Sequence, residues 1–247
     1  MKYALELSYE GNHFSGWQLQ PDSITVQEVL EEALTVLEGA PVKVSGAGRT
    51  DSGVHARGQV ASFELSKTWD PYRLTLAVNA NLPEHVSVMR ASAVPDDFDA
   101  RRSALWREYA YFVWHGPSCF PHVRDMVWWR KRDDWDMDAV DGCCRALVGE
   151  HDFGAFCRLS ECPENAVRTL FSVRHIRRGR LSIFRIRGKG FLTNMVRIIL
   201  GNIDAVATGK KRLEWFERLL LGGTRVDSAT TAPASGLFFW RVGYDDF

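Results

Sequence analysis

The sequence lacks any apolar run that approaches the roughly 20 residues of a membrane-spanning helix, so we expect no membrane partner. Its first residues, MKYALELSYEG, have no long apolar core and no cleavage site, and we expect no secretory signal. Low-complexity segments and short repeats are also missing. What remains is a chain of 247 residues, 45% of them hydrophobic, which is enough to bury the core of one large domain or two small ones.

Cysteine is scarce, and its spacing does not suit a structural framework. The number is odd and no C-x-x-C pair occurs, which disfavours both a disulfide scaffold and a zinc site. Reduced thiols in a cytoplasmic protein fit this pattern best. The five cysteines are Cys119, Cys143, Cys144, Cys157 and Cys162.

A net charge is absent as well, because 31 basic residues balance 31 acidic ones. The balance hides an asymmetry along the chain. Residues 1–100 carry 7 Lys and Arg against 14 Asp and Glu, a net of −7, which leaves 24 against 17, a net of +7, for residues 101–247. The second part is therefore the one that favours an anionic partner.

No acidic residue occurs between Arg168 and Arg197, a stretch that holds eight Arg and one Lys and that we call the basic run. A solvated face usually mixes both signs, so a run of one sign on predicted strands suggests a polyanion. The alternative is a basic patch that answers the acidic half across a domain or subunit contact. Charge alone leaves both interpretations open.

The apolar patterns predict an α+β fold made of two similar halves with antiparallel sheets, joined near 97–104. In the first half a T-x-x-E capping box at Thr25 opens a helix that Gly39 ends. Its order is the βαββαβ of a ferredoxin-like unit. We expect strands over 3–9, 42–45, 59–65 and 86–93, with helices from 26 to the stop at 39 and over 71–79.

The second half repeats this order with insertions. Two predicted strands form a hairpin around RRGR, and a long helix contains FLTNMVR. We take residues 1–100 as one domain and residues 101–247 as the other. Expected strands cover 106–114, 169–176, 181–187 and 237–244, and expected helices cover 137–147, 191–205 and 211–221.

The loop GRTDSGVHAR between two predicted strands of the first half is longer than a hairpin needs. Thr-Asp-Ser-Gly is also an ordinary turn in which Asp binds its own backbone. Three features favour a functional site. Arg49 lies beside Asp51, the glycines let a large ligand approach the backbone, and His55 and Arg57 offer hydrogen-bond donors to phosphate. One carboxylate among cations suits nucleophilic or general-base work at carbon and not a metal, which needs more ligands.

The same loop resembles the signature of the tRNA pseudouridine synthase A (TruA) family, and the resemblance spans essentially the whole chain. Six separated blocks agree in order and spacing. Beside GRTDSGVHARGQV they include LSYEGNHFSGWQLQP with TVQEVLEEAL, FDARRSALWREYAYFV, GEHDFGAFC, GKGFLTNMVRIILGNI and TAPASGLFFWRV. The resemblance implies the pseudouridine synthase fold, with a basic cleft between its two halves.

The resemblance also implies roles for residues. Asp51 of the R-T-D motif is the expected catalytic nucleophile, Tyr109 packs against the target base, and Arg197 of M-V-R pairs with the carboxylate. Arg49, His55 and Arg57 are expected to bind substrate. The implied reaction converts uridine to pseudouridine at tRNA positions 38, 39 and/or 40, in the anticodon arm. It uses no metal or organic cofactor, and the implied enzyme is a homodimer in which one tRNA contacts both subunits.

Several alternatives stay open. Asp51 attacks C1′ of the ribose, or it takes the 2′ proton and the reaction passes through a glycal. A binder of RNA without catalysis and a metal-dependent hydrolase using His55, His151 and Asp152 are the competing functions. Departures from the family pattern are Leu19, Ser52 and Asn194. The basic side chains expected to meet tRNA phosphates are Arg174, Arg177, Arg178, Arg180, Arg185, Arg187 and Lys189.

Overall fold

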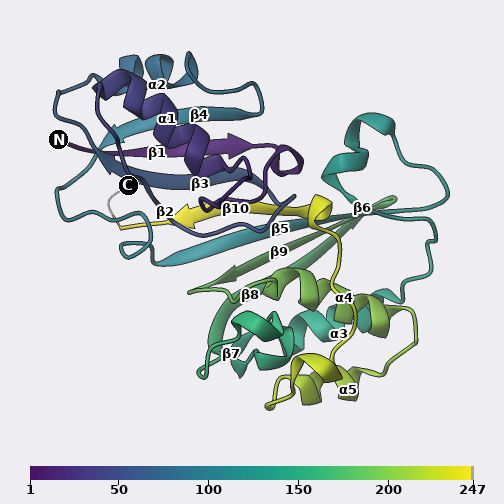
Figure 1. The fold of residues 1–247 in the computed structure, drawn as a ribbon. Coiled ribbons are helices and arrows are strands. Elements are labelled where there is room, and N and C mark those ends of the chain that lie inside the picture. Colours follow the sequence, from purple (N-terminus) through teal and green to yellow (C-terminus); the bar gives the residue numbers. More distant parts are fainter. Residues whose placement is uncertain (246–247) are drawn as a thin grey trace. The chain divides into compact units, whose positions relative to one another are not determined.

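The structure, a computed structural model, describes residues 1–245 (Figure 1). Its contacts divide the chain into two units, which are described separately. Unit 1 is Met1–Arg107 together with the C-terminal segment from Phe238, and unit 2 is Glu108–Leu237. Within residues 1–245, no helix is both long enough and apolar enough to cross a membrane.

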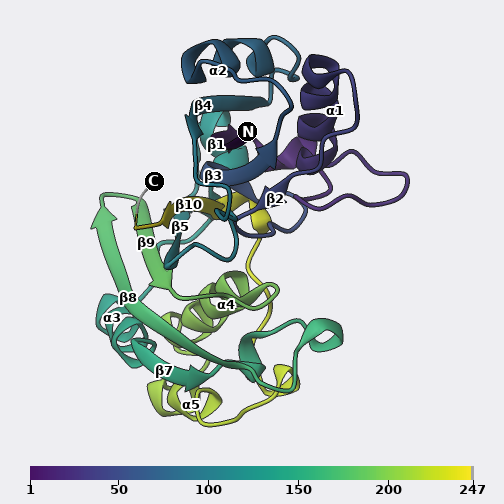
Figure 2. The same cartoon turned by 90° about the vertical axis from the view of Figure 1, so that its left-hand side faces the viewer.

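Unit 1 has the ferredoxin-like order expected from the sequence. Strands β4, β1 and β3 are neighbours in the sheet, β2 and β10 both pair with β3, and helices α1 and α2 cover one face (Figures 1 and 2). The fold class is therefore α+β, as predicted. The elements are β1 (Lys2–Tyr9), η1 (Gly11–His13), α1 (Val26–Glu38), β2 (Ser45–Gly46), β3 (His55–Glu64), α2 (Pro71–Asn79), β4 (Val86–Ala93) and β10 (Leu237–Gly243).

Helix α1 begins and ends where the sequence predicts. The Thr25 and Glu28 side chains form both bonds of the capping box, and Gly39 ends the helix with a φ of 79°. Its apolar stripe, which includes Leu30 and Leu34, is fully buried against the sheet.

Two strand predictions in unit 1 are wrong in their bounds. The strand expected over 42–45 is only Ser45–Gly46, because Glu31 of α1 accepts hydrogen bonds from the Val44 N–H and Lys43 Nζ and draws the preceding residues to the helix. Strand β3 starts at His55 rather than at residue 59, because β10 pairs with its first residues. That pairing joins segments far apart in sequence, and no local pattern reports it.

The C-terminal strand β10 pairs in parallel with β3, Phe238 opposite His55 and Phe239 opposite Ala56. Sequence order alone placed this strand with the second half, whereas its residues from Phe238 lie in unit 1. The division into a catalytic half, residues 1–100, and a basic half, residues 101–247, stays a prediction.

Unit 2 contains a sheet in the order β5-β9-β8-β7, and α3, α4 and α5 pack together against it (Figure 1). The hairpin of β8 and β9 turns at Gly179, with a φ of 57°, as the sequence predicts. The strands and α-helices are β5 (Trp106–His115), β6 (Trp128–Arg130), α3 (Met137–Ala146), β7 (Gly149–Asp152), β8 (Val167–Arg178), β9 (Leu181–Gly188), α4 (Met195–Ala207) and α5 (Leu213–Leu219). The 3-10 turns are η2 (Pro121–Met126), η3 (Gly154–Phe156), η4 (Leu159–Glu161), η5 (Arg225–Asp227) and η6 (Ala234–Gly236).

Helix α4 starts four residues later than predicted. Asn194 has a φ of 61°, a left-handed conformation that a right-handed helix does not contain, so the helix begins at Met195. The apolar residues before it, which suggested an earlier start, belong to a loop. Helix α5 is likewise shorter than expected, because Arg212 is its extended N-cap residue.

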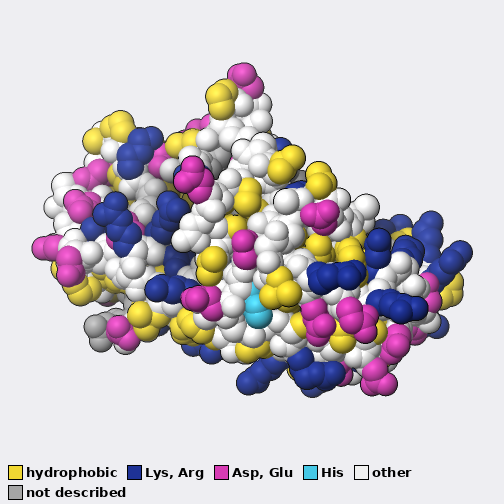
Figure 3. Space-filling view, turned by 90° about the horizontal axis from the view of Figure 1, so that it is seen from below, with side chains coloured by type: hydrophobic (Ala, Val, Ile, Leu, Met, Phe, Trp, Pro, Cys, Tyr) yellow, Lys and Arg dark blue, Asp and Glu magenta, His cyan; other side chains and the backbone are white. Residues whose placement is uncertain are grey.

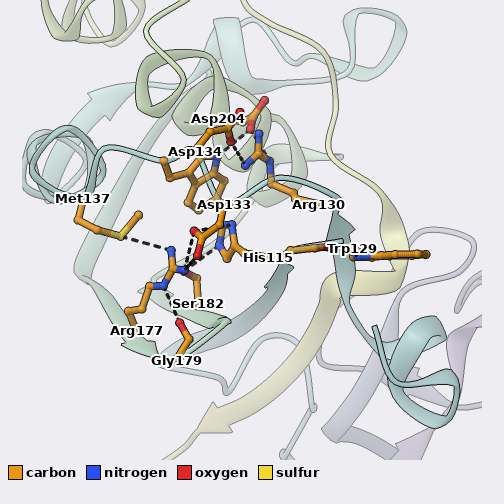
Figure 4. A network of polar contacts seen from close by, with 12 residues as sticks. His115, Trp129, Arg130, Asp133, Asp134, Met137, Arg177, Gly179, Ser182 and Asp204 are labelled. Atoms are coloured by element: carbon orange, nitrogen blue, oxygen red, sulfur yellow. Dashed lines mark hydrogen bonds and ion pairs between the residues drawn. The ribbon is translucent and has the colours of Figure 1, made fainter. Parts of the chain in front are cut away.

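A buried chain of polar side chains crosses unit 2 (Figure 4). His115 and Ser182 are fully buried, and Ser182 Oγ lies 3.1 Å from His115 Nε2 and 3.2 Å from Nε2 of His175. Asp133 lies 4.0 Å from Nδ1 of His115 and accepts two 2.7 Å hydrogen bonds from Arg177. The pKa of His115 is lowered to about 4, mainly by burial. The charge of Arg177 lowers this pKa as well, and its effect is larger than the opposite effect of Asp133.

The buried His115 predicts a loss of stability in acid. Its pKa rises from about 4 in the fold to 6.5 when unfolded, so the unfolded chain binds an extra proton between these values. We expect this group to remove about 1 kcal/mol of unfolding free energy between about pH 7.5 and pH 5.5. Urea unfolding of wild type and His115→Gln at both pH values measures it.

The His115→Gln protein is less stable at neutral pH but should have the shallower pH dependence. The pKa of His175 is also lowered by burial, and its Nε2 shares Ser182 Oγ with His115, so the difference between the two pH profiles reports the loss of His115 together with the change it causes at His175. Parallel pH profiles for the two proteins would contradict the prediction.

Candidate active site

The loop that carries Asp51, residues 47–54, is anchored at both ends and in its middle by backbone hydrogen bonds. The Ala47 N–H donates to the Val60 carbonyl at 2.8 Å, and the Trp17 N–H donates to the Thr50 carbonyl at 3.0 Å. The Val54 N–H donates to the carbonyl of Asp51 itself at 3.1 Å, which closes a turn around the carboxylate-bearing residue. The backbone of Asp51 is thus fixed by its own loop and by the segment 14–17.

Three side chains from outside the loop bind its remaining polar groups. Gln59, fully buried on β3, donates to the Gly48 carbonyl at 2.7 Å. The Tyr9 hydroxyl lies 2.8 Å from Thr50 Oγ1, and burial raises the pKa of Tyr9 to about 12, so it stays a neutral phenol. Arg107 donates from Nε at 3.1 Å and from Nη2 at 3.0 Å to the Ala47 carbonyl.

The same Arg107 also binds two carbonyls of the segment that precedes β5. Its guanidinium donates to Ala104 at 3.2 Å and to Arg101. One planar, permanently charged group therefore joins the root of the Asp51 loop to the segment 101–104.

Glycine is required at two contacts with this loop. Gly16 has a φ of 107°, and a Cβ there would lie 2.7 Å from the Thr50 carbonyl oxygen. A Cβ on Gly48 would lie 2.7 Å from the ring of Phe239. Both glycines let neighbouring chain segments approach closely, so the loop is packed and not an open turn.

The predicted substrate-binding residues of unit 1 lie on this loop and on β3. Asp51 is half-buried, while Arg49 and Arg57 are exposed. The Arg57 guanidinium lies 4.9 Å above the ring of Trp240, a cation–π contact that orients it. The loop and the start of β3 thus carry two exposed cations and one half-buried carboxylate.

His55 differs from these exposed residues, because only 1% of it is accessible. Its Nδ1 accepts a 3.1 Å hydrogen bond from the Gly11 N–H, and its ring stacks on Phe238 at 4.6 Å. Acceptance at Nδ1 places the proton of a neutral ring on Nε2, so Nε2 is the nitrogen left to donate. Its predicted contact with substrate phosphate stays a prediction.

Tyr109 and Arg197 lie in unit 2. Tyr109 is buried on β5, and its ring meets Phe191 edge-to-face at 4.8 Å. Arg197 lies in the first turn of α4, where Nε donates to the Ala232 carbonyl and Nη1 donates to Asn194 Oδ1, both at 2.9 Å. Asn194, a departure from the family pattern, therefore orients the arginine whose role the resemblance predicts.

Three arginines of the basic run form ion pairs with acidic residues from outside it. Glu108, buried on β5, pairs with Arg185 and with Arg187, the latter at 2.9 Å, and Arg177 pairs with Asp133. Burial raises the pKa of Glu108, but hydrogen bonds and charge from Arg187 and Arg185 outweigh this and hold it below its usual value. Figure 3 shows Lys and Arg interspersed with Asp and Glu on the face it presents. The exposed members of the run are Arg174, Arg178, Arg180 and Lys189.

The residues of the alternative metal-dependent hydrolase have other roles. Asp152 Oδ1 accepts a 2.8 Å hydrogen bond from the Gly154 N–H, which is an ordinary turn, and His151 Nε2 lies 3.2 Å from the Val148 carbonyl. Both belong to unit 2, whereas His55 belongs to unit 1. The described contacts offer that hydrolase no support.

Comparison with known proteins agrees with this geometry. The family model described as tRNA pseudouridine synthase matches residues 7–101 and 143–245, which include the Asp51 loop, the hairpin and α4. The chain therefore belongs to the tRNA pseudouridine synthase family. This confirms the family that the motifs indicated and the isomerase class predicted from it.

Relatives match over nearly their whole length. The chain is 37% identical over 243 residues to tRNA pseudouridine synthase A of Brachyspira hyodysenteriae, covering 98% of each protein. It is 41% identical over 244 residues to the protein of that name from Citrifermentans bemidjiense, covering 98% of this chain and 97% of the relative. A solved Cbf5–Nop10–Gar1 complex matches at 12% identity over 98% of this chain and 60% of that chain, with a TM-score of 0.40, which is too distant to support the fold.

The sequence did not single out the residues that hold the Asp51 loop. Tyr9 and Gln59 alternate as ordinary strand residues, and Arg107 belongs to a motif read for its tyrosines. The signal that could have pointed to them is a Gln and a Tyr in strands predicted to be buried, because each buried polar group needs a hydrogen-bond partner.

Arg107 is expected to position the loop. In Arg107→Ala the carbonyls of Ala47, Ala104 and Arg101 lose their donor, and a shift of the loop should lower kcat by about 10–100-fold. We expect little change in tRNA affinity. Single-turnover pseudouridine formation and filter binding measure the two effects.

The matched control is Arg102→Ala, which removes an exposed arginine of the neighbouring segment. Equal kcat losses in both variants, or a loss confined to tRNA binding, would refute the positioning role.

Proposed function

We propose that this tRNA pseudouridine synthase modifies uridine at positions 38, 39 and/or 40 of tRNA, with Asp51 as the catalytic carboxylate. The observation that carries the proposal is the loop 47–54. Its backbone and side-chain hydrogen bonds fix the backbone that carries Asp51, a half-buried residue close in sequence to the exposed arginines Arg49 and Arg57. A carboxylate on a fixed loop beside cationic residues suits catalysis better than RNA binding alone, because a carboxylate repels phosphate.

The reaction is an isomerisation and needs no co-reactant. The N1–C1′ bond breaks, the uracil turns over, C5 bonds to C1′, the C5 proton leaves and N1 gains a proton. Positive character develops at C1′ as the glycosidic bond breaks, and an ionised Asp51 stabilises it or bonds to it. In the alternative route Asp51 removes the 2′ proton, and a glycal forms before C5 attacks.

Tyr109 and Arg197 support this chemistry from unit 2. The edge contact with Phe191 holds the Tyr109 ring in one orientation, which suits an aromatic face that stacks on an extruded base. Arg197 is oriented by Ala232 and Asn194, which suits a guanidinium that keeps a carboxylate ionised. Both roles are proposals.

The remaining partners are proposed as well. Exposed Arg174, Arg178 and Arg180 are suited to tRNA phosphates, in a basic cleft that takes the anticodon arm. We infer a homodimer and a reaction that needs no metal or organic cofactor. All five cysteines within the described residues are free thiols, which supports the proposed cytoplasmic location.

Asp51→Ala should abolish turnover and keep binding. We expect pseudouridine formation to fall by about 10³-fold or more, because the group that acts at C1′ is removed, while the phosphate contacts persist. Unmodified tRNA transcripts are incubated without added cofactor, and pseudouridine is mapped by carbodiimide treatment and primer extension. Electrophoretic shifts report binding.

Asp97→Ala, at an exposed carboxylate outside the loop, is the control and should behave as wild type. Stops 3′ of the anticodon with Asp51→Ala would exclude this carboxylate. Bound tRNA without stops for wild type would instead indicate a different target or a binding protein.

A further inference from the structure

Three potential metal ligands meet at the end of β1, outside the Asp51 loop. Glu10 directly precedes the 3-10 turn η1, His13 is the last residue of that turn, and His85 directly precedes β4. The antiparallel pairing of β1 with β4 brings them together, since the Glu10 N–H donates to the His85 carbonyl at 3.0 Å. The sheet therefore fixes the backbones from which all three side chains project.

The distances among the three side chains fit an ion better than direct hydrogen bonds. Glu10 Oε2 lies 3.5 Å from His13 Nε2 and 3.4 Å from His85 Nδ1. Good N–H···O bonds measure about 2.7–3.2 Å. Bonds of about 2.0–2.1 Å from a tetrahedral zinc to nitrogen and oxygen place neighbouring ligand atoms about 3.3 Å apart. One donor atom of each residue lies within 4.8 Å of the others.

The two imidazoles stack with their centroids 3.4 Å apart and their planes 3° from parallel. Each ring turns a nitrogen toward the same carboxylate oxygen. Parallel rings at this separation do not both aim a nitrogen lone pair at one ion, so a shared ion requires one ring to turn. The His13 side chain is 40% exposed and is free to tilt its nitrogen toward an ion.

His85 has a further feature of a metal ligand. Its second nitrogen, Nε2, lies 3.4 Å from Glu84 Oε1. Ligating histidines commonly pass their other N–H to a carboxylate, which sets the tautomer and strengthens the ligand. At 3.4 Å this contact is longer than a good hydrogen bond, so Glu84 becomes the outer partner of the site only when its exposed side chain moves closer.

We propose that Glu10, His13 and His85 bind one divalent transition-metal ion of the zinc type. Two imidazoles and one carboxylate suit zinc, cobalt, nickel or copper, and they disfavour magnesium, which takes oxygen ligands. Three protein ligands leave a fourth position for water. The ion would link η1 to the start of β4. Since the Gly11 N–H of η1 donates to His55 on β3, this link would also connect to the strand that follows the Asp51 loop. The site stands apart from the proposed reaction, which uses no metal.

Calorimetric titration of the metal-free full chain with Zn(II) tests the site. We expect one ion per chain, a Zn(II)-dependent rise in thermal midpoint, and affinity more than about 10-fold weaker in His13→Ala and His85→Ala. Glu84→Gln should weaken binding by about 10-fold through His85. His122→Ala, at an exposed histidine elsewhere, should match wild type.

Co(II) absorption separates this site from the cysteines, because nitrogen and oxygen ligands give no intense thiolate charge-transfer band. Unchanged Zn(II) affinity in both histidine variants, a thiolate band, or no Zn(II) binding by wild type would each overturn the proposal.

Discussion

The position of Asp51 depends on how groups outside its loop satisfy the backbone carbonyls of that loop. Gly48, Thr50 and Ala47 each place a carbonyl where only groups outside the loop reach it, and Gln59, the Trp17 N–H and Arg107 are those groups. Two of the donors are side chains, those of Gln59 and Arg107. Residues outside the loop thus fix the backbone that carries Asp51, as precise orientation on a loop requires.

Local patterns predicted most of the elements and the ferredoxin-like order of unit 1, but not the pairing of β10 with β3. Helix α1 has its capping box and its terminal glycine in the sequence, and the β8–β9 hairpin has its turn, so both were predicted closely. The bounds of β2 and β3 were predicted wrongly. The Glu31 side chain binds the residues before β2, and the pairing with β10 extends β3 at its start. Nor does any local signal reveal the left-handed Asn194 that delays α4.

The family motif was recognised because its residues adjoin in sequence, whereas the groups that hold its loop are scattered along the chain. Arg49, Asp51, His55 and Arg57 lie within one loop and strand, but only the structure shows that His55 is buried and bonded through Nδ1. Composition misled in one respect. The basic run has no acid in its own sequence, yet Glu108 and Asp133, which lie outside it, form ion pairs with three of its arginines and offset two of their charges. Charge counted along a chain overstates the charge available to an RNA.

Asn194 shows how a departure from the family pattern can be absorbed by geometry. Its left-handed backbone ends the loop and starts α4, a conformation that asparagine tolerates better than most residues. From that position its side-chain oxygen accepts from Arg197 three residues later, while the Ala232 carbonyl accepts from the other side of the guanidinium. One residue thus sets both the start of the helix and the plane of the arginine. A substitution here would disturb Arg197 through the backbone even if the side-chain hydrogen bond were replaced.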